Sequence, residues 1–348
     1  MIKLLVQKLE VVAFSITNTC NLNCRFCSRE ASVNSGTHLS PTIIHQTVID
    51  VLDFAKPRTF SLTGGEPLCH PNFWDILSNF YSLGLSVRLN TNATYITRST
   101  AIRLSEKGVK QITLSIDSLD QTTNSILGRG ASYLDTISNA ITSLKVANID
   151  FFVKSTLNQR NLHEARSIMN FAIKMGAVGF SVGRTVPVGR GKELVEDYLL
   201  PWNKYKEICQ QCSSDIPNQF KFLIDDPLKH YIDLRIDKLL KEYEFDLENM
   251  VAGCSAGLSL LYVLPNGDVL SCPAIPKVVG NLYEDSIRDI WLSSDVLRKL
   301  RDRDSLKGEC GRCDRRYICG GCRAAAYGIH GDLLAEDPAC PKTEDLHC

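Results

Sequence analysis

Short apolar runs rich in β-branched residues alternate with longer amphipathic stretches through the first half of the chain. The short runs predict strands, because valine, isoleucine and threonine favour an extended, half-buried backbone. The predicted strands are residues 11–17, 59–63, 85–90, 111–116, 150–156 and 178–182. Helical segments lie between them, and Ser40-Pro41 offers one a cap and a first residue. This alternation predicts an α/β fold, a parallel sheet with crossover helices that is open or curled into a partial barrel.

The pattern changes after about residue 200. Residues 201–250 predict polar helices, and residues 258–272 predict a β-hairpin, because Asn266-Gly267 is a strong turn signal. From residue 310 onward the chain is rich in cysteine and glycine and too poor in apolar residues to build much core, so bound metal would have to fold it. We therefore expect an α/β unit, a helical bridge and a cysteine-rich domain, at residues 1–200, 201–250 and 251–348.

The charge balance excludes some classes of partner. The 39 lysines and arginines equal the 39 aspartates and glutamates, which gives no electrostatic reason to expect nucleic acid or an anionic membrane. The first residues contain no long apolar run followed by a cleavage site, and no stretch of about 18 uninterrupted apolar residues predicts a membrane span. We therefore expect a cytoplasmic protein without a signal peptide.

The 14 cysteines are the strongest compositional signal. In a chain without a secretory signal, so many cysteines favour metal binding over disulfides. Three of them, Cys20, Cys24 and Cys27, have C-x3-C-x2-C spacing directly after the first predicted strand, and seven more lie between Cys254 and Cys340. Because the chemistry of such sheets lies at the carboxyl ends of the strands, the first group occupies a position where a site is expected.

Three thiolates can hold three irons of a [4Fe–4S] cluster and leave the fourth iron open to another ligand. The C-x3-C-x2-C motif, with Phe26 just before its last cysteine, resembles that of the radical S-adenosylmethionine enzymes. In that family the amino and carboxylate groups of S-adenosylmethionine chelate the open iron. Spacing alone leaves a zinc site with a distant fourth ligand as the alternative.

Gly64-Gly65-Glu66-Pro67, after the second predicted strand, resembles a second motif of the same family. The resemblance implies that this stretch binds the methionine amino group: the glycines allow close approach of the backbone, and the carboxylate accepts the ammonium. It also implies contacts to the ribose or adenosine at later strand ends, from Asn90, Asn92, Ser115, Asp117 and Arg184. A cap or turn role is the alternative for each of these.

The C-terminal cysteines resemble the SPASM domain, an extension of radical S-adenosylmethionine enzymes that holds two auxiliary iron–sulfur clusters. The resemblance implies one cluster on Cys310, Cys313, Cys319 and Cys340, and another on Cys254, Cys272 and Cys322. The Cys319–Cys322 step is C-x2-C here, where the family usually has C-x3-C. A pair of zinc knots is the alternative from spacing alone.

The set of Cys254, Cys272 and Cys322 has only three members. No cysteine lies between Cys254 and Cys272, and position 324 is alanine. We therefore expect an open iron on this cluster, or a fourth ligand from Cys348 or from a side chain other than cysteine.

Several other residues predict structural roles. We expect Cys69 to be a packing residue. Cys209 and Cys212 have C-x2-C spacing on a predicted helix, so we expect two thiols on one helix face, with a redox pair as the alternative. Asn161 with Glu164 predicts a capping box before a helix.

The resemblance implies an enzyme in which a reduced cluster cleaves S-adenosylmethionine, and the resulting 5′-deoxyadenosyl radical abstracts hydrogen from a C–H bond. The auxiliary clusters would accept an electron from the product or bind substrate, and flavodoxin or ferredoxin would be the electron donor. Asp117, Asp120 and Tyr133 are available as proton acceptors, but nothing in the sequence singles one out.

SPASM proteins mostly act on peptides, so our first hypothesis is modification of a ribosomally made peptide by cross-linking, epimerisation or oxidation. Only 19 residues precede Cys20, and we therefore expect a separate leader-binding protein or a substrate without a leader. Side-chain oxidation in tetrapyrrole synthesis and formylglycine formation by a sulfatase maturase are the enzymatic alternatives. A non-catalytic iron–sulfur or zinc protein would cleave no S-adenosylmethionine.

Overall fold

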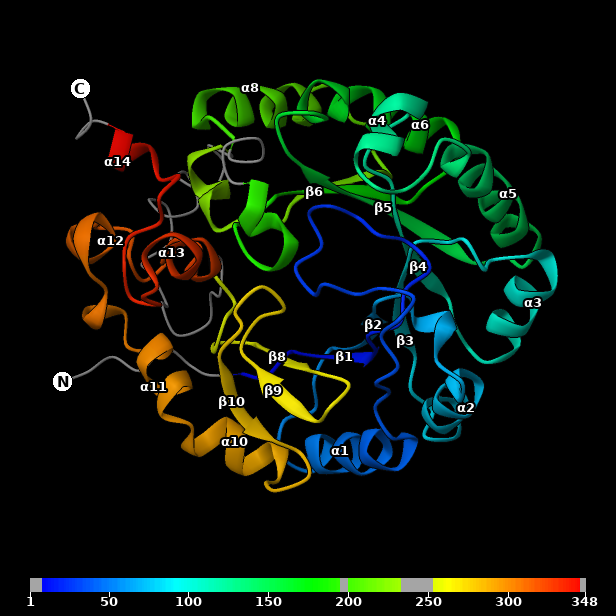
Figure 1. The fold of residues 1–348 in the computed structure, drawn as a ribbon, viewed down its shortest axis with the longest axis horizontal. Coiled ribbons are helices and arrows are strands. Elements are labelled where there is room, and N and C mark those ends of the chain that lie inside the picture. The colour runs from blue at the N-terminus through cyan, green and yellow to red at the C-terminus, as the bar shows by residue number, and fades with distance from the viewer. Residues whose placement is uncertain (1–7, 195–199, 233–252, 345–348) are drawn as a thin grey trace.

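The computed structural model describes residues 8–194, 200–232 and 253–344. Its centre is a ten-stranded sheet with the strand order β10-β9-β8-β1-β2-β3-β4-β5-β6-β7. Strands β1 to β7 pair in parallel and in chain order. The sheet curls, and helices cover its outer side (Figure 1). These strands are β1 (Val11–Thr17), β2 (Thr59–Gly64), β3 (Val87–Thr91), β4 (Gln111–Ser115), β5 (Asp150–Leu157), β6 (Gly179–Arg184) and β7 (Lys221–Ile224).

The helices between the strands form the outer layer of the barrel. They are α1 (Pro41–Phe54), α2 (Phe73–Ser82), α3 (Arg98–Glu106), α4 (Gln121–Ile126), α5 (Tyr133–Val146), α6 (Ala165–Lys174) and α8 (Trp202–Ser213). Ser40 caps α1 as predicted, because its side chain accepts the N–H of Thr42 and Pro41 follows as the first helical residue. The core lies between strands and helices, where residues such as Phe14, Leu62 and Ile112 are fully buried.

Residues along β5 alternate between two environments. Phe151, Val153 and Leu157 are buried in the core under the helices. Lys154 and Thr156 point the other way and are only half-buried. We call this concave side, which faces the middle of the barrel, the inner face. The partial barrel predicted from the sequence is therefore present, with a polar inner face at the carboxyl ends of its strands.

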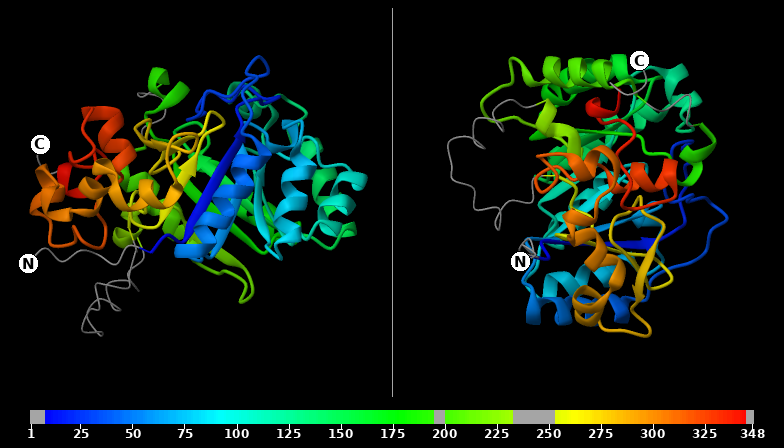
Figure 2. Two further views of the ribbon diagram at one scale, coloured as in Figure 1. Left: turned by 90° about the horizontal axis from the view of Figure 1, so that it is seen from below. Right: turned by 90° about the vertical axis from the view of Figure 1, so that its left-hand side faces the viewer.

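The C-terminal part joins the same sheet. Strand β8 (Leu260–Val263) pairs in parallel with β1. The predicted hairpin forms between β8 and β9 (Asp268–Leu270), with Gly267 at a φ of +84° in the turn. β10 (Val278–Asn281) follows, and the helices beyond it gather beside the barrel (Figures 1 and 2). They are α10 (Ile287–Ser293), α11 (Asp295–Arg301), α12 (Gly308–Arg312), α13 (Arg323–His330) and α14 (Pro341–Glu344).

Short 3-10 turns complete the connections. They are η1 (Pro67–Cys69), η2 (Leu162–Glu164), η3 (Gly189–Leu194), η4 (Pro227–Tyr231) and η5 (Arg303–Ser305). No helix in the described part of the chain has the length and hydropathy that crossing a membrane requires.

Two local predictions need correction. Residues 221–224, predicted as part of a helical bridge, form β7 and extend the barrel beyond β6, whereas α8 is helical as predicted; residues 233–250 of that bridge lie outside the described residues. The capping box before α6 is also wrong. Asn161 accepts the backbone N–H of Asn158, and Glu164 accepts the hydroxyl of Ser118, so both side chains bind neighbouring loops instead.

Candidate active site

Cys20, Cys24 and Cys27 lie in the loop that follows β1, at the carboxyl end of the parallel strands. All three line one cavity of about 160 Å³. The loop between them is held by the backbone of a neighbouring segment, because the N–H of Arg25 donates to the carbonyl of Leu127 at 3.1 Å. The structure thus brings the three cysteines to one site.

Arg190 fastens this cysteine loop from the other side of the barrel. Its Nε donates to the carbonyl of Cys24 at 2.8 Å, and its Nη1 donates to the carbonyl of Ala31 at 3.0 Å. Its backbone N–H donates to the carbonyl of Cys27 at 3.1 Å. Sequence reasoning missed this residue. Its position in a Gly-Arg-Gly step after the sixth strand was the only available signal.

Gly64 and Gly65 allow β2 to approach the cysteine loop closely. A Cβ on Gly65 would lie 2.3 Å from the carbonyl oxygen of Thr19 and 2.9 Å from the Cβ of Cys20. A Cβ on Gly64, whose φ is +147°, would lie 2.4 Å from the carbonyl oxygen of Thr17. Side chains of any size would therefore displace the loop that carries Cys20.

Glu66 is fully buried and joins the ends of β2 and β3. Its carboxylate accepts the hydroxyl of Thr91 at 2.7 Å and the backbone N–H groups of Asn92 and Leu68 at 2.8 and 3.2 Å. Burial raises the pKa of Glu66 to about 7, although these three donors oppose the rise. Gly65 and Thr91, which neighbour Glu66, line the cavity of the cysteine loop, but Glu66 itself is not among its lining residues. Pro67 begins η1 directly after it.

Asn90, Asn92 and Ser115 line the same cavity as the three cysteines. Asn90 donates to the hydroxyl of Ser61 at 2.8 Å, and the side chain of Asn92 lies 3.8 Å from the sulfur of Cys20. The ends of β3 and β4 thus contribute polar side chains to the wall of this cavity.

Asp117 does not line the cavity itself but binds Arg129, which does. It is buried, accepts the N–H of Thr156 at 2.7 Å, and forms an ion pair with Arg129. Arg129 lines the cavity, and its guanidinium lies 5.8 Å from the ring centroid of Phe26 and 2.8 Å from the hydroxyl of Tyr133. The sequence analysis did not identify Arg129, because nothing in its local pattern distinguishes it from a surface arginine.

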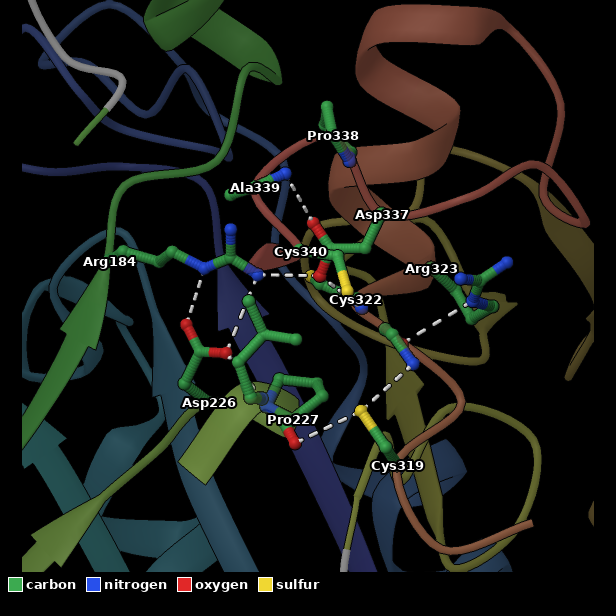
Figure 3. A network of polar contacts seen from close by, with 12 residues as sticks. Arg184, Asp226, Pro227, Cys319, Cys322, Arg323, Asp337, Pro338, Ala339 and Cys340 are labelled. Atoms are coloured by element: carbon green, nitrogen blue, oxygen red, sulfur yellow. Dashed lines mark hydrogen bonds and ion pairs between the residues drawn. The ribbon is translucent and has the colours of Figure 1, made fainter. Parts of the chain in front are cut away.

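Arg184 lies outside the cavity of the cysteine loop. Its guanidinium forms ion pairs with Asp226 and, at 2.7 Å, with Asp337 (Figure 3). Asp337 in turn accepts the backbone N–H of Cys322 at 2.7 Å. The structure therefore brings Arg184 to the C-terminal cysteines, and it is not among the residues that line the cavity of the cysteine loop.

Cys310, Cys313, Cys319 and Cys340 line one small apolar cavity, as the resemblance implied for one cluster. Their sulfurs face N–H donors: the backbone N–H of Asp337 and a guanidinium nitrogen of Arg323 each lie 3.4 Å from Cys310, and the N–H of Gly321 lies 3.4 Å from Cys319. Such donors surround the thiolates of iron–sulfur proteins, where they tune the cluster.

Cys254, Cys272 and Cys322 belong to a second, separate apolar cluster with Ala256, Ile275 and Ala324. Burial and the neighbouring Cys254 raise the pKa of Cys272 to about 12, and the charges of Asp225 and Lys154 act on it with opposite signs. The expected alternative ligand, Cys348, lies outside the described residues. In the described part of the chain, no three His, Cys, Asp or Glu side chains form a site for a single metal ion.

The residues of the first site fit a thiolate-bound cluster with a small polar ligand. Three cysteines share the cavity with the amides of Asn90 and Asn92, while Arg129 and Arg190 supply positive charge beside it. Burial raises the pKa of Cys24 and Arg129 opposes the rise, and bound iron would favour the thiolate form of this cysteine.

Comparisons with known proteins agree with this fit. A family model of the radical SAM superfamily matches residues 14–172, and one of an iron–sulfur cluster-binding domain, SPASM, matches residues 254–314. The AdoMet-dependent heme synthase of Methanosarcina barkeri is 34% identical over 95% of this chain and 95% of that relative. The mycofactocin maturase MftC of Mycobacterium tuberculosis is 27% identical over 94% of this chain and 82% of that relative.

Solved structures share the fold. The structure of Streptococcus suis SuiB bound to S-adenosylmethionine has a TM-score of 0.76 at 18% identity and covers 97% of this chain and 78% of SuiB. That of anSMEcpe with bound AdoMet has a TM-score of 0.70 at 18% identity, with coverage of 97% and 95%. The chain therefore belongs to the radical SAM superfamily, carries a SPASM domain, and is an enzyme that uses S-adenosylmethionine and iron–sulfur clusters as cofactors.

Proposed function

We propose that this enzyme oxidises a side chain of a tetrapyrrole. The observation that carries the proposal is the likeness to the AdoMet-dependent heme synthase of M. barkeri, which extends along 95% of both chains at 34% identity. Two further heme synthases, at 26% and 25% identity, also match along 95% of this chain. These likenesses support the tetrapyrrole alternative more than the peptide hypothesis.

The radical-generating site is assigned to the cavity at the carboxyl ends of β1 to β4. Cys20, Cys24 and Cys27 would hold the [4Fe–4S] cluster, and Gly64, Gly65, Glu66, Pro67, Asn90, Ser115 and Phe26 would surround S-adenosylmethionine. When bound there, the cofactors supply the radical that abstracts hydrogen from the substrate. Asp117 would act by holding Arg129 at the wall of this cavity.

The two C-terminal cysteine sets are assigned to auxiliary clusters. Cys310, Cys313, Cys319 and Cys340 share one cavity and would give a fully ligated cluster. Cys254, Cys272 and Cys322 would give one with a position left for substrate, for Cys348 or for another side chain. Either cluster could take the electron that substrate oxidation releases. The electron donor is proposed to be a flavodoxin or ferredoxin, and the compartment the reduced cytoplasm.

Anaerobic reconstitution with iron and sulfide, followed by dithionite and S-adenosylmethionine, tests this function. We expect propionate-bearing porphyrins, with or without iron, to raise 5′-deoxyadenosine formation above the substrate-free rate. Mass spectrometry should show an oxidised porphyrin in equal amount. The proposal would be refuted if, on enzyme with intact clusters, none of the porphyrins raised 5′-deoxyadenosine formation and no oxidised porphyrin appeared.

Peptide modification is the second candidate. Its support is the 27% identity to mycofactocin maturase MftC over 94% of this chain. SuiB, solved with its precursor peptide SuiA, shares the fold alone at 18% identity. This candidate predicts that a short peptide, presented with a leader-binding protein where one is needed, gains or loses mass in the same assay. The formylglycine alternative has only the fold likeness of anSMEcpe behind it.

A further inference from the structure

Lys154 lies on the inner face of the barrel, on the strand beside the proposed radical site. It pairs in register with Ser115, which lines the cavity of the cysteine loop. Two residues further along β5, the backbone N–H of Thr156 donates to Asp117. A lysine at this position points into the middle of the barrel, where most neighbouring inner-face residues are small or uncharged, such as Thr113, Ser115 and Ser181.

Asp225 forms an ion pair with Lys154 from directly after β7. The N–H of Asp225 donates to the carbonyl of Val182 at 2.7 Å, which fixes its backbone to the end of β6. Each charge favours the ionised form of the other: Asp225 raises the pKa of Lys154, and Lys154 lowers the pKa of Asp225. The pair is therefore a full ammonium and a full carboxylate at neutral pH.

Both side chains remain accessible although they lie inside the barrel. The Lys154 side chain is 42% exposed and that of Asp225 is 61% exposed. Gly183 packs closely against the backbone of Asp225, because a Cβ there would lie 3.1 Å from the Asp225 carbonyl oxygen. An ion pair this exposed contributes little to stability, so stability alone does not explain a charged pair on the inner face.

The pair also lies near the second cysteine region. The charges of Lys154 and Asp225 both act on the thiol of Cys272, and the charge of Asp117 acts on Lys154. Lys154 therefore lies close enough to both Asp117, which holds the wall of the radical site, and Cys272 for their charges to interact.

We propose that Lys154 binds a carboxylate of the substrate inside the barrel, and that Asp225 is its counter-ion until the substrate arrives. A substrate carboxylate would compete with the exposed Asp225 for the ammonium of Lys154, which offers three donors. This inference rests on the proposed function, because tetrapyrroles of the haem type carry propionate side chains. It assigns the residue that would orient such a side chain toward the radical.

Binding of protoporphyrin IX and of its dimethyl ester to the reconstituted enzyme tests the inference, with fluorescence as the readout. The wild type should bind the free acid about tenfold or more tightly than the ester, the preference that one charge-assisted hydrogen bond provides. Lys154→Met should remove this preference, and Lys154→Arg should retain most of it. Asp225→Asn should strengthen it, because the competing carboxylate is gone.

Lys174→Met, on the exposed end of α6, is the matched control and should leave both affinities unchanged. Iron content shows whether each variant has assembled its clusters. Opposite shifts for Lys154→Met and Asp225→Asn would distinguish carboxylate binding from a structural role, which would weaken both probes in both variants.

The outcomes separate the two proposals. If the wild type prefers the acid and Lys154→Met keeps that preference, the role of Lys154 is refuted and the proposed function stands. Equal wild-type affinity for acid and ester also refutes the role of Lys154 and leaves the proposed function standing. If the wild type binds neither porphyrin, the proposed function fails and this inference fails with it.

Discussion

Arg184 of β6 and Asp337 of the C-terminal region form a buried ion pair, with 2.7 Å between Nη2 and Oδ2. Asp337 also accepts the N–H of Cys322 through its side chain and donates its own N–H to the sulfur of Cys310. The carboxylate of Asp337 thus connects the end of a barrel strand to Cys322 (Figure 3), and the backbone N–H of the same residue contacts Cys310 of the other cysteine set.

Arg184→Met should therefore destabilise the protein strongly. It leaves the buried carboxylates of Asp226 and Asp337 without their cation, and breaking such a buried pair costs about 3–5 kcal/mol. Urea unfolding should show this loss together with reduced iron content. Arg58→Met, which removes an exposed pair with Glu10, is the control and should cost less than about 1 kcal/mol. Equal effects of the two variants would contradict the role of the network.

Glu66→Gln should change how stability depends on pH. The folded protein keeps the Glu66 proton up to about pH 7, whereas the unfolded chain releases it near pH 4.5. Wild-type stability therefore falls as the pH rises through this window, by up to about 3 kcal/mol from this group. Glutamine has no such proton, so the variant should lack this part of the slope. Thermal unfolding between about pH 5.5 and 7.5 measures the difference, and parallel curves would rule out a raised pKa.

Gly65→Ala should disrupt the cysteine loop. The new Cβ would meet the Thr19 carbonyl at 2.3 Å, and overpacking of this kind typically costs about 1–3 kcal/mol. We expect loss of the iron bound at Cys20, Cys24 and Cys27 and of S-adenosylmethionine cleavage. Gly36→Ala is the control, because no atom lies within 4 Å of its added Cβ. Normal cleavage by Gly65→Ala would show that the contact tolerates a side chain.

The grouping of the C-terminal cysteines can be tested by additivity. Cys313 and Cys340 line one cavity, so Cys313→Ala and Cys340→Ala should each lower the iron content of the same cluster. The double variant should then lose no more iron than either single variant. Cys272→Ala combined with Cys313→Ala should lose the iron of both clusters. Iron and sulfide analysis with Mössbauer spectroscopy provides the count. An additive loss for Cys313 and Cys340 would mean that they serve different clusters.

Regular elements could be predicted because their patterns are local. The strand at residues 11–17 was predicted with the bounds that β1 has, and Gly267 marked the hairpin turn through its need for positive φ. β7 was missed because Lys221–Ile224 is only four residues long, and its run of three apolar residues is too short to distinguish a strand from a helical segment. Pairing with β6, rather than its own composition, makes it a strand.

Motif residues could be placed, but their partners could not. The sequence indicated the cysteines and the Gly-Gly-Glu-Pro stretch, and the structure brings Cys20 and Gly65 into contact range. Arg129 and Arg190 were not found, because each reaches the site from a distant loop through contacts that no short pattern encodes. Arg184 was placed near the adenosine by motif position, whereas its observed carboxylate partners lie far along the chain.

The parallel pairing of β8 with β1 has a consequence for how the protein can be divided. A fragment that stops before residue 254 would leave β1 as a bare edge, with its unpaired backbone groups open to association with other chains. Packing of α10 against α1 would be lost as well. The barrel and the cysteine-rich region should thus unfold in one cooperative transition. Loss of metal from the cysteine-rich region should therefore lower the solubility of the barrel.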